Sequence, residues 1–311
     1  HAIHHAIHHA IHHAIHHAIH HADSKAPAKR SRSPVGTQRR SSRTFPCMET
    51  ISLARTGHVV TATINNPNSP MNAVDEQLHH DFGELFRMLK MADDELLVGA
   101  RVIVLTGSGR AFSAGGDMAW FPELRTPDRL TRLRREGKQI IWDQLDVEIP
   151  IVCGLNGPAV GLGASIALMC DVIVMAETAA IIDPHVQVGL VAGDGGAAIW
   201  PLLLGPMAAK RHLLLGDPLT AVEALRLGVA AEICPAIDVG AGALRWAERI
   251  AAQAPLAVQG TKIAVNQQLK QALLTSFDVS MALEMPCFNS ADHAEAVAAF
   301  VEKRTPKFEG K

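Results

Sequence analysis

The chain has 311 residues, a formal net charge of −2, and 48% apolar against 19% charged residues, proportions that are ordinary for a globular protein. This length suffices for one large domain or two small ones around a buried core. The near-neutral charge gives no argument for a nucleic-acid or membrane-surface partner, and no apolar run approaches the roughly 20 residues of a membrane span. The five scattered cysteines show neither metal-site spacing nor the even number of a disulfide framework, so we expect a cytoplasmic protein with reduced thiols.

Residues 1–47 have the composition of a tag followed by a tail. Residues 1–22 repeat His-Ala-Ile-His, which is typical of an expression tag; a metal-binding histidine tract is the alternative. Residues 23–45 are rich in Ser, Pro and Arg, which predicts a disordered basic tail, with a transit peptide or a nucleic-acid-binding tail as alternatives. We interpret Met48 as the natural start.

The first folded residues predict a hairpin, a helix and a buried strand. Residues 49–55 and 58–65 have strand character on either side of a Thr-Gly turn. Residues 73–92 carry apolar side chains at helical spacing, and residues 100–106 form a β-branched run typical of a buried strand. Further strands are expected at 149–155 and 171–175.

Capping residues predict where the later helices begin. Thr126 is a good N-cap and is followed by a proline, and Thr220 with Glu223 forms a capping box. Residues 240–311 are predicted to be almost wholly helical, and we expect Asp292 and Glu295 to cap the last helix. Strands that alternate with helices, followed by a helical end, predict an α/β core with a C-terminal helical part.

Residues 156–200 hold the densest set of chemically useful side chains. The Gly-rich run 156–165 leads into an apolar helix, and such a loop can present backbone N–H groups to a developing negative charge on oxygen. A tight turn between buried elements is the alternative. In Asp183-Pro184-His185 the imidazole can take a proton from water, and Asp194, nine positions later, can orient it. The alternative is a core histidine and an aspartate that caps the next helix.

Several motifs in order resemble the enoyl-CoA hydratase/isomerase (crotonase) family over residues 49–308. The motifs are residues 110–117, Asn156-Gly157 with Gly161 and Gly163, Cys170-Asp171, residues 189–196 and the ending 299–308. The resemblance implies an α/β fold, a spiral of ββα units with a C-terminal helical trimerisation part, and trimers that often pair into hexamers. It predicts a spiral core at 48–238 and a helical region at 239–311, after the tag and tail that the composition indicates at 1–47.

The resemblance also implies the substrate and its contacts. The family usually acts on acyl-CoA thioesters and holds the thioester oxygen with two backbone amides, which by position are those of Gly116 and Leu162. Leu162 stands where the family usually has Gly, but the contact uses only the backbone. The expected substrate-binding residues are Ser113, Ala114, Asp117, Gly161, Ser165 and Lys262. Arg110, Arg304 and Lys307 are further candidates for CoA phosphates. No metal is implied, and no cofactor apart from the coenzyme A of the substrate.

The chain departs from the family at its two catalytic glutamates. Their positions hold Ser165 and His185, so the two-glutamate hydration mechanism is not available. Ser165 cannot act as a base without an activating partner, and we interpret it as a small helix residue. His185 then becomes the acid/base and Asp194 its partner, while Glu284 on a C-terminal helix is either an additional acid or a solvated side chain.

Three functions stay open. The first is a lyase or isomerase of acyl-CoA and fatty acid metabolism. The second is a hydrolase that cleaves a C–C bond of a β-diketone, because Pro184-His185, residues 193–195 and Trp200 resemble the 6-oxocamphor hydrolase-like branch of the family, although that branch employs another histidine. The third is a non-catalytic acyl-CoA-binding relative. Trp120 and Trp142 either shape an acyl pocket or pack in the core.

Overall fold

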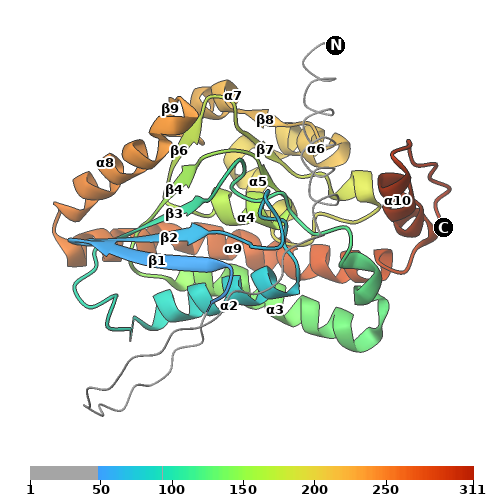
Figure 1. The fold of residues 1–311 in the computed structure, drawn as a ribbon, viewed down its shortest axis with the longest axis horizontal. Coiled ribbons are helices and arrows are strands. Elements are labelled where there is room, and N and C mark those ends of the chain that lie inside the picture. Colours follow the sequence, from blue (N-terminus) through green and yellow to red (C-terminus); the bar gives the residue numbers. More distant parts are fainter. Residues whose placement is uncertain (1–47, 93) are drawn as a thin grey trace, which may run out of the picture. The chain divides into compact units, whose positions relative to one another are not determined.

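The computed structural model describes residues 48–92 and 94–311 (Figure 1). The predictions for residues 1–47 lie outside the described residues. Within the described part the chain forms the expected α/β fold with a C-terminal helical region.

The main sheet has six strands in the order β1-β2-β3-β4-β6-β9. The strands are β1 Ile51–Thr56, β2 Val59–Ile64, β3 Val102–Gly107, β4 Ile151–Leu155, β6 Val172–Ala176 and β9 Glu232–Cys234. β1 and β2 form the predicted antiparallel hairpin, and every other neighbouring pair is parallel. The predicted strands are confirmed with small shifts of their ends.

Helices follow most strands, as the capping residues and the apolar spacing predict. The α-helices are α2 Glu76–Met91, α3 Pro127–Asp146, α4 Leu162–Leu168, α5 Gly196–Leu204, α6 Pro206–Leu215, α7 Ala221–Arg226, α8 Val239–Ala251, α9 Pro255–Cys287 and α10 Ala291–Glu302. The short 3-10 helices are η1 Phe121–Arg125, η2 His185–Val188 and η3 Ala236–Asp238.

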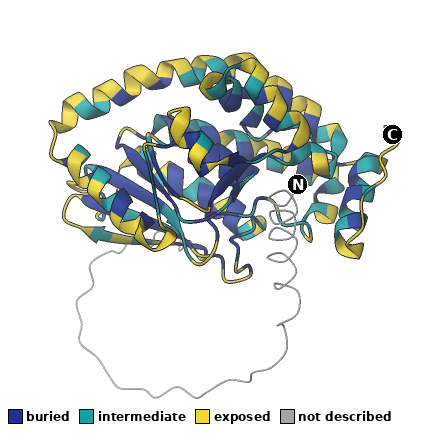
Figure 2. Ribbon diagram, turned by 90° about the horizontal axis from the view of Figure 1, so that it is seen from above, coloured by how far each residue is buried: buried dark blue, intermediate teal, exposed yellow. Residues whose placement is uncertain are grey.

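The strand side chains alternate between two helical layers. Successive residues of a strand point to opposite faces of a sheet. Val60 and Ile103 face one layer, which includes buried residues of α2, α3 and α9, whereas Val59 and Val104 pack with Ala243 of α8 on the other. Buried residues accordingly fill the strands, and the helices keep exposed outer faces (Figure 2). Helix α9 shares the main core, so residues 48–311 form one compact unit.

Two helix starts show which capping predictions hold. The Thr126 side chain accepts a hydrogen bond from the Arg129 amide, as expected. The last helix differs, because its N-cap is Ser290, whose hydroxyl accepts from the His293 amide at 3.0 Å. Asp292 instead accepts hydrogen bonds from the amides of the final residues 309 and 310.

A second, small sheet was not predicted. Its strands are β5 Ala159–Val160, β7 Ala180–Ile182 and β8 Leu219–Thr220. Strands of two or three residues are too short to show a period-2 pattern. β5 and β7 run parallel, and this pairing positions the site described below.

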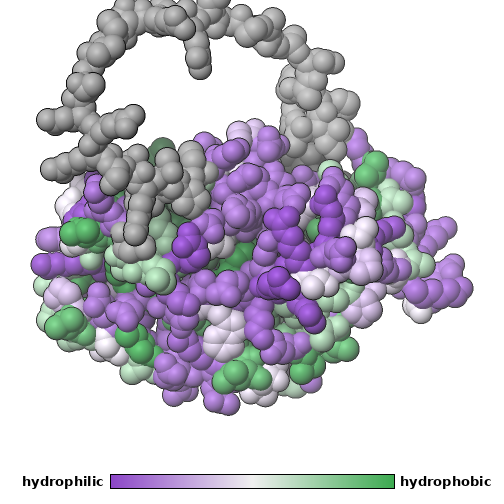
Figure 3. Space-filling model, turned by 90° about the horizontal axis from the view of Figure 1, so that it is seen from below, coloured by the Kyte–Doolittle hydropathy of each residue, from purple (hydrophilic) through white to green (hydrophobic). Residues whose placement is uncertain are grey.

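The described helices include none that is long and apolar enough to cross a membrane. The face drawn in Figure 3 is largely hydrophilic, and its hydrophobic side chains form separate patches.

A substitution of Gly157 is a test of how tightly the loop after β4 is packed. A Cβ built on Gly157 would lie 2.1 Å from the carbonyl oxygen of Arg110, which is backbone and cannot rotate away. Gly157→Ala should therefore lower the free energy of unfolding by about 1–3 kcal/mol, measured by urea denaturation.

The matched control is Gly240→Ala in α8, where no atom lies within 4 Å of the added carbon. This change should leave stability unchanged or raise it by up to about 1 kcal/mol, because alanine favours a helix. Equal stabilities of the two variants would contradict the packing described for Gly157.

Candidate active site

Three parallel pairings bring the loops of the site together. Val74 forms a bridge with Gly116, and Ser113 forms a bridge with Ala159. β5 then pairs with β7. The loops after β3 and β4 and the segment after β7 therefore meet at the carboxyl ends of neighbouring strands, where open α/β sheets bind ligands.

The two amides expected to hold an oxyanion lie in these loops. Val74 donates to the Gly115 carbonyl at 2.7 Å and accepts from the Asp117 amide at 3.0 Å. The N–H of Gly116, between them, takes no part in this bridge. Leu162 is the first residue of α4, where the N–H groups have no carbonyl partner within the helix. Contact of these two amides with a ligand stays a prediction.

Gly161 joins the oxyanion loop to the catalytic side chains. Its φ of 53° favours glycine, and its amide donates to the Ile182 carbonyl at 3.0 Å. A Cβ built there would lie 3.6 Å from Cε1 of His185 and 3.8 Å from Oδ2 of Asp194. It would also lie 3.9 Å from the Cα of Gly115. The amide that follows Gly161 is thus close to both the imidazole and the first oxyanion loop.

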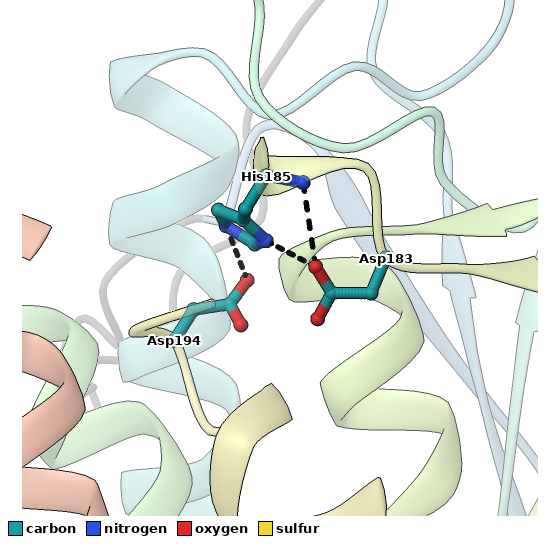
Figure 4. Close-up of side chains that lie close together, drawn as sticks. All are labelled: Asp183, His185 and Asp194. Atoms are coloured by element: carbon teal, nitrogen blue, oxygen red, sulfur yellow. Dashed lines mark hydrogen bonds and ion pairs between the residues drawn. The ribbon is translucent and has the colours of Figure 1, made fainter. Parts of the chain in front are cut away.

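Asp183 fixes the imidazole of His185 (Figure 4). Its Oδ1 lies 2.6 Å from Nδ1 of His185, and it also accepts the His185 amide at 3.4 Å. Asp183 is completely buried. Because the carboxylate can only accept while it is ionised, Nδ1 carries a proton and Nε2 is the nitrogen that faces the site.

Asp194 lies on the other side of the ring, with Oδ2 3.5 Å from Nε2 of His185 (Figure 4). The orienting bond predicted for Asp194 is made by Asp183 instead. Asp194 is itself held by the hydroxyl of Ser165, which donates to its Oδ1 at 3.0 Å, and by the backbone amide of Gly196. Ser165 is fully buried, so its hydroxyl positions Asp194 in addition to filling a small space in the helix.

Glu284 of α9 completes the group. Its Oε1 lies 3.8 Å from Nε2 of His185, and only 6% of the residue is exposed. A Cβ built on Gly193 would lie 2.1 Å from Oε2 of Glu284, so the carboxyl group fits against a position that only glycine can occupy. The alternative of a solvated Glu284 does not hold in this structure.

Burial and mutual charge shift the pKa values of His185 and of the two carboxyl groups beside its Nε2, those of Asp194 and Glu284. Burial lowers the pKa of His185, but the carboxylates of Asp183, Asp194 and Glu284 outweigh it and raise that pKa well above 6.5. Burial raises the pKa of Asp194. Burial and the charges of the two aspartates raise the pKa of Glu284 to about 8, against the charge of His185, which lowers it. At neutral pH, Glu284 therefore holds a proton, and the charges of Asp183 and Asp194 favour the protonated form of His185.

The ligand atoms of Asp183, His185 and Asp194 also lie within 4.8 Å of one another, close enough to hold a metal ion. The two carboxylates, however, face different ring nitrogens, at 2.6 Å and 3.5 Å. A single metal ion binds one nitrogen of an imidazole, so hydrogen bonding and proton transfer are the better use of this geometry.

The first oxyanion loop uses its own side chains for structure. Ser113 is buried, and its hydroxyl donates to the Asn72 carbonyl at 2.8 Å. The Ala114 amide donates to the Met71 carbonyl at 2.9 Å. The Asp117 carboxylate accepts an amide two residues later. Contacts of these residues with a substrate stay a prediction.

The expected phosphate-binding cations are partly engaged elsewhere. Nζ of Lys262 is buried and donates to the Ile149 carbonyl at 3.0 Å and to Asp171 at 2.8 Å. Arg304 pairs with Glu295 at the C-terminal helix. Lys262 thus connects α9 to residues next to the strands of the main sheet, and this structural role does not require a ligand.

The tryptophans differ in their surroundings. Trp200 is fully buried, and its ring lies 5.2 Å from that of His212, so it belongs to the core. Trp142 packs against the main core, whereas Trp120 packs with a separate cluster around η1.

The sequence predicted no role for Asp183, and for Glu284 it allowed either an additional acid or a solvated side chain. The signal for Asp183 is its position two residues before His185 in a turn. The sequence contains no comparable signal for Glu284, because only the packing of α9 brings it to the imidazole.

The chain resembles known proteins over nearly all of its described length. Residues 54–311 match the sequence model of the enoyl-CoA hydratase/isomerase family. A protein named probable mitochondrial enoyl-CoA hydratase from Dictyostelium discoideum is 31% identical over 263 residues, which cover 84% of this chain and 91% of that protein.

Two solved structures have similar folds. An enoyl-CoA hydratase/isomerase from Mycobacterium paratuberculosis is 37% identical, with a TM-score of 0.76 over 81% of this chain and 99% of that one. A β-diketone hydrolase from the cyanobacterium Anabaena, bound to (S)-3-oxocyclohexyl acetic acid, is 28% identical, with a TM-score of 0.70 over 77% of this chain and 94% of that one.

The raised pKa of Glu284 predicts how stability depends on pH. The unfolded chain releases this proton near pH 4.5, but the folded chain keeps it until about pH 8. The unfolded state therefore binds fewer protons in this window, and the free energy of unfolding falls as pH rises from about 4.5 to about 8. Glu284→Gln removes the effect, so denaturant unfolding should show a smaller decline between these pH values.

The control is Glu248→Gln, an exposed residue of α8, which should decline in parallel with the wild type. Parallel curves for Glu284→Gln and the wild type would contradict the protonated state assigned to Glu284.

Proposed function

Because the chain belongs to the enoyl-CoA hydratase/isomerase family, we propose that it is an enzyme that acts on an acyl-CoA thioester through an enolate, with His185 as the acid/base. One observation supports this most. The imidazole of His185, fixed by Asp183, lies beside Gly161, and a Cβ on Gly161 would be 3.6 Å from its ring. The next amide is that of Leu162, so a carbonyl bound there has the base next to its α-carbon.

The amides of Gly116 and Leu162 would hold the carbonyl oxygen. The negative charge on this oxygen grows as the enolate forms, so fixed donors stabilise the transition state more than the substrate. Removing one such donor typically costs about 3–4 kcal/mol of transition-state stabilisation. The substitution of glycine by Leu162 leaves this contribution in place, because the amide alone makes the contact.

His185 would move the proton. Its raised pKa favours the cation, so Nε2 would release a proton before it acts as a base, and Asp194, 3.5 Å away, is the nearest acceptor. The neutral ring keeps its Nδ1 proton on Asp183 and presents Nε2 to the substrate. The pKa of Asp194 is raised by burial, which brings the two sites closer in proton affinity and eases this transfer.

Glu284 would act as an acid in the same reaction. It is protonated at neutral pH because its pKa is raised to about 8, and it lies 3.8 Å from Nε2. A neutral carboxyl group can donate a proton to the substrate, which a solvated glutamate cannot do at this pH. Base and acid thus come from one buried group of side chains.

Coenzyme A would enter as part of the substrate and not as a separate cofactor. Of the predicted phosphate contacts, Arg110 has no ion pair among the described residues, so it stays available, unlike Lys262 and Arg304. We also propose a cytoplasmic homotrimer or hexamer. In support, α5 and α9 line an apolar groove of about 840 Å³, with Leu256 85% exposed and Val265 57% exposed.

A second function is favoured by the replacement of both catalytic glutamates. A histidine flanked by Asp194 and Glu284 can also activate water for attack on a ketone, with the enolate as the leaving group. Cleavage of a C–C bond in a β-diketone would use the same two amides. The similarity to the Anabaena β-diketone hydrolase supports this alternative.

Binding and turnover distinguish the two. Calorimetry with acetoacetyl-CoA and with a cyclic β-diketone, followed by assays of hydration, isomerisation and C–C cleavage, identifies the substrate class. Tight binding of the thioester supports the first function, and cleavage of the diketone without CoA supports the second. Thioester binding without turnover would indicate a non-catalytic relative.

The variants of the acid/base group should differ in severity. His185→Ala should abolish turnover while the circular dichroism spectrum stays unchanged. Asp183→Asn should cost on the order of 10⁴-fold in kcat, because it disturbs the tautomer of the ring. Asp194→Asn should cost less, since it leaves the Nδ1 bond in place. Wild-type rates in His185→Ala, or a larger loss in Asp194→Asn than in Asp183→Asn, would contradict these roles.

A further inference from the structure

A separate apolar cluster lies beside the first oxyanion loop. It consists of Leu124, Leu130, Leu190 and Phe288, with Trp120 and Phe121 packed against it. We call this cluster, together with the neighbouring side chains of Arg125 and His293, the η1 wall. A Cβ built on Gly116 would lie 2.4 Å from the ring of Phe121, so the wall touches the first oxyanion loop.

The η1 wall also touches the segment that carries His185. Nδ1 of His293, in α10, lies 2.7 Å from the carbonyl oxygen of Val188, the last residue of η2. The ring of His293 is 5.5 Å from that of Phe121 and 5.3 Å from that of Phe288. The wall therefore borders the site from the oxyanion loop to the end of η2.

Three polar nitrogens in this wall are buried without a partner among the described residues. They are Nε1 of Trp120, Nε of Arg125 and Nε2 of His293. A buried polar group without a hydrogen bond costs free energy, so native proteins rarely keep one unless something else satisfies it. Nε2 of His293 is an acceptor, because Nδ1 donates to the Val188 carbonyl, so the donors without a partner are those of Trp120 and Arg125. These two donors suggest that a polar group from outside the chain completes the wall.

Arg125 is the residue with the strongest need for a partner. Its guanidinium cannot lose its charge in a protein. Within the described residues it makes no ion pair, although Arg129, four positions later, pairs with both Glu76 and Glu123. Its charge reaches His293, whose pKa is lowered by burial and by Arg125. Among the described residues, Arg125 therefore has a positive charge without a carboxylate partner.

We propose that Arg125, with Trp120, forms a subsite for a carboxylate that the substrate carries at the end remote from its reacting carbonyl. A guanidinium pairs with a carboxylate through two parallel hydrogen bonds, and the indole N–H of Trp120 supplies another donor. The rings of Phe121 and Phe288 suit the methylene groups between the two ends. The proposal rests on the proposed function, since it assigns the acyl part of the same substrate.

The anion could come from two sources, a carboxylate on the acyl chain or a phosphate of coenzyme A. The acyl chain is favoured because the wall begins at Phe121, which packs on Gly116, the residue whose amide would hold the carbonyl oxygen. A group reaching the wall is therefore attached close to the reacting carbon. The experiment separates the two sources.

The test compares acyl-CoA esters of equal length that end in a methyl or a carboxylate group. The pairs are butyryl- and succinyl-CoA, pentanoyl- and glutaryl-CoA, and hexanoyl- and adipyl-CoA, measured by calorimetry. The free acids pentanoate and glutarate are measured beside them. The variants are Arg125→Gln and Arg125→Lys, with Arg134→Gln as the matched control, because Arg134 is exposed on the neighbouring helix α3. Circular dichroism checks the fold of each variant.

The proposal predicts that the wild type binds the carboxylate-ended ester of at least one length about tenfold more tightly than its methyl-ended partner. Arg125→Gln should abolish this preference and change the affinity for the methyl-ended ester by less than about twofold. Arg125→Lys should keep part of the preference, and Arg134→Gln should keep all of it.

Three results would overturn the subsite. They are no preference in the wild type at any length, a preference that survives Arg125→Gln, and an equal loss of both esters in Arg125→Gln, which would assign the anion to a CoA phosphate. If no ester binds, the proposed action on CoA thioesters is wrong, and the binding of the free acids tests the subsite alone. Tighter binding of glutarate than of pentanoate, lost in Arg125→Gln, supports a carboxylate subsite that does not need CoA. Equal binding of the two acids by the wild type overturns the subsite.

Discussion

The pairing of two very short parallel strands determines the geometry of the site. Val160 of β5 pairs with Ile182 of β7, and the amide of Gly161 donates to the Ile182 carbonyl at 3.0 Å. This register sets the first amide of α4 beside the turn that carries His185. Because Ser113 bridges Ala159 on the opposite edge of β5, the first oxyanion loop is held in the same register. A slip of one residue would move every group of the site away from the others.

The site places four ionisable side chains, three carboxyl groups and one imidazole, together in a buried space. Asp183, Asp194 and Glu284 surround one imidazole, and burial together with these mutual charges raises the pKa values of Glu284 and His185. Burying such a group costs stability unless each charge is paired and hydrogen-bonded. Oδ2 of Asp183 is buried without a hydrogen-bond partner among the described residues. The arrangement is understandable if proton transfer, and not stability, selected it, since catalytic groups need shifted pKa values.

The sequence predicted the parts of this molecule that rest on local patterns. Residues 100–106 and 149–155 have the composition of buried strands, and the family motifs pointed to the loops that hold Gly116 and Leu162. The second sheet was not predictable, because strands of two or three residues have no detectable period. The nine-residue spacing of His185 and Asp194 suggested an orienting pair, but chain geometry in the turn gives Nδ1 to Asp183, two residues away. Glu284 depends on how α9 packs over α5, which no local signal in a long helix reveals.

The most direct test of the account is the ionisation state of bound acetoacetyl-CoA, whose enolate absorbs in the near ultraviolet. An enolate band is expected when the wild type binds the ester, because the amides of Gly116 and Leu162 would stabilise the oxyanion and His185, once its Nε2 proton has passed to Asp194, would accept the proton. In His185→Ala the ester should still bind by calorimetry but stay in its keto form. An enolate band of equal strength in the variant would contradict the role of His185 as the base.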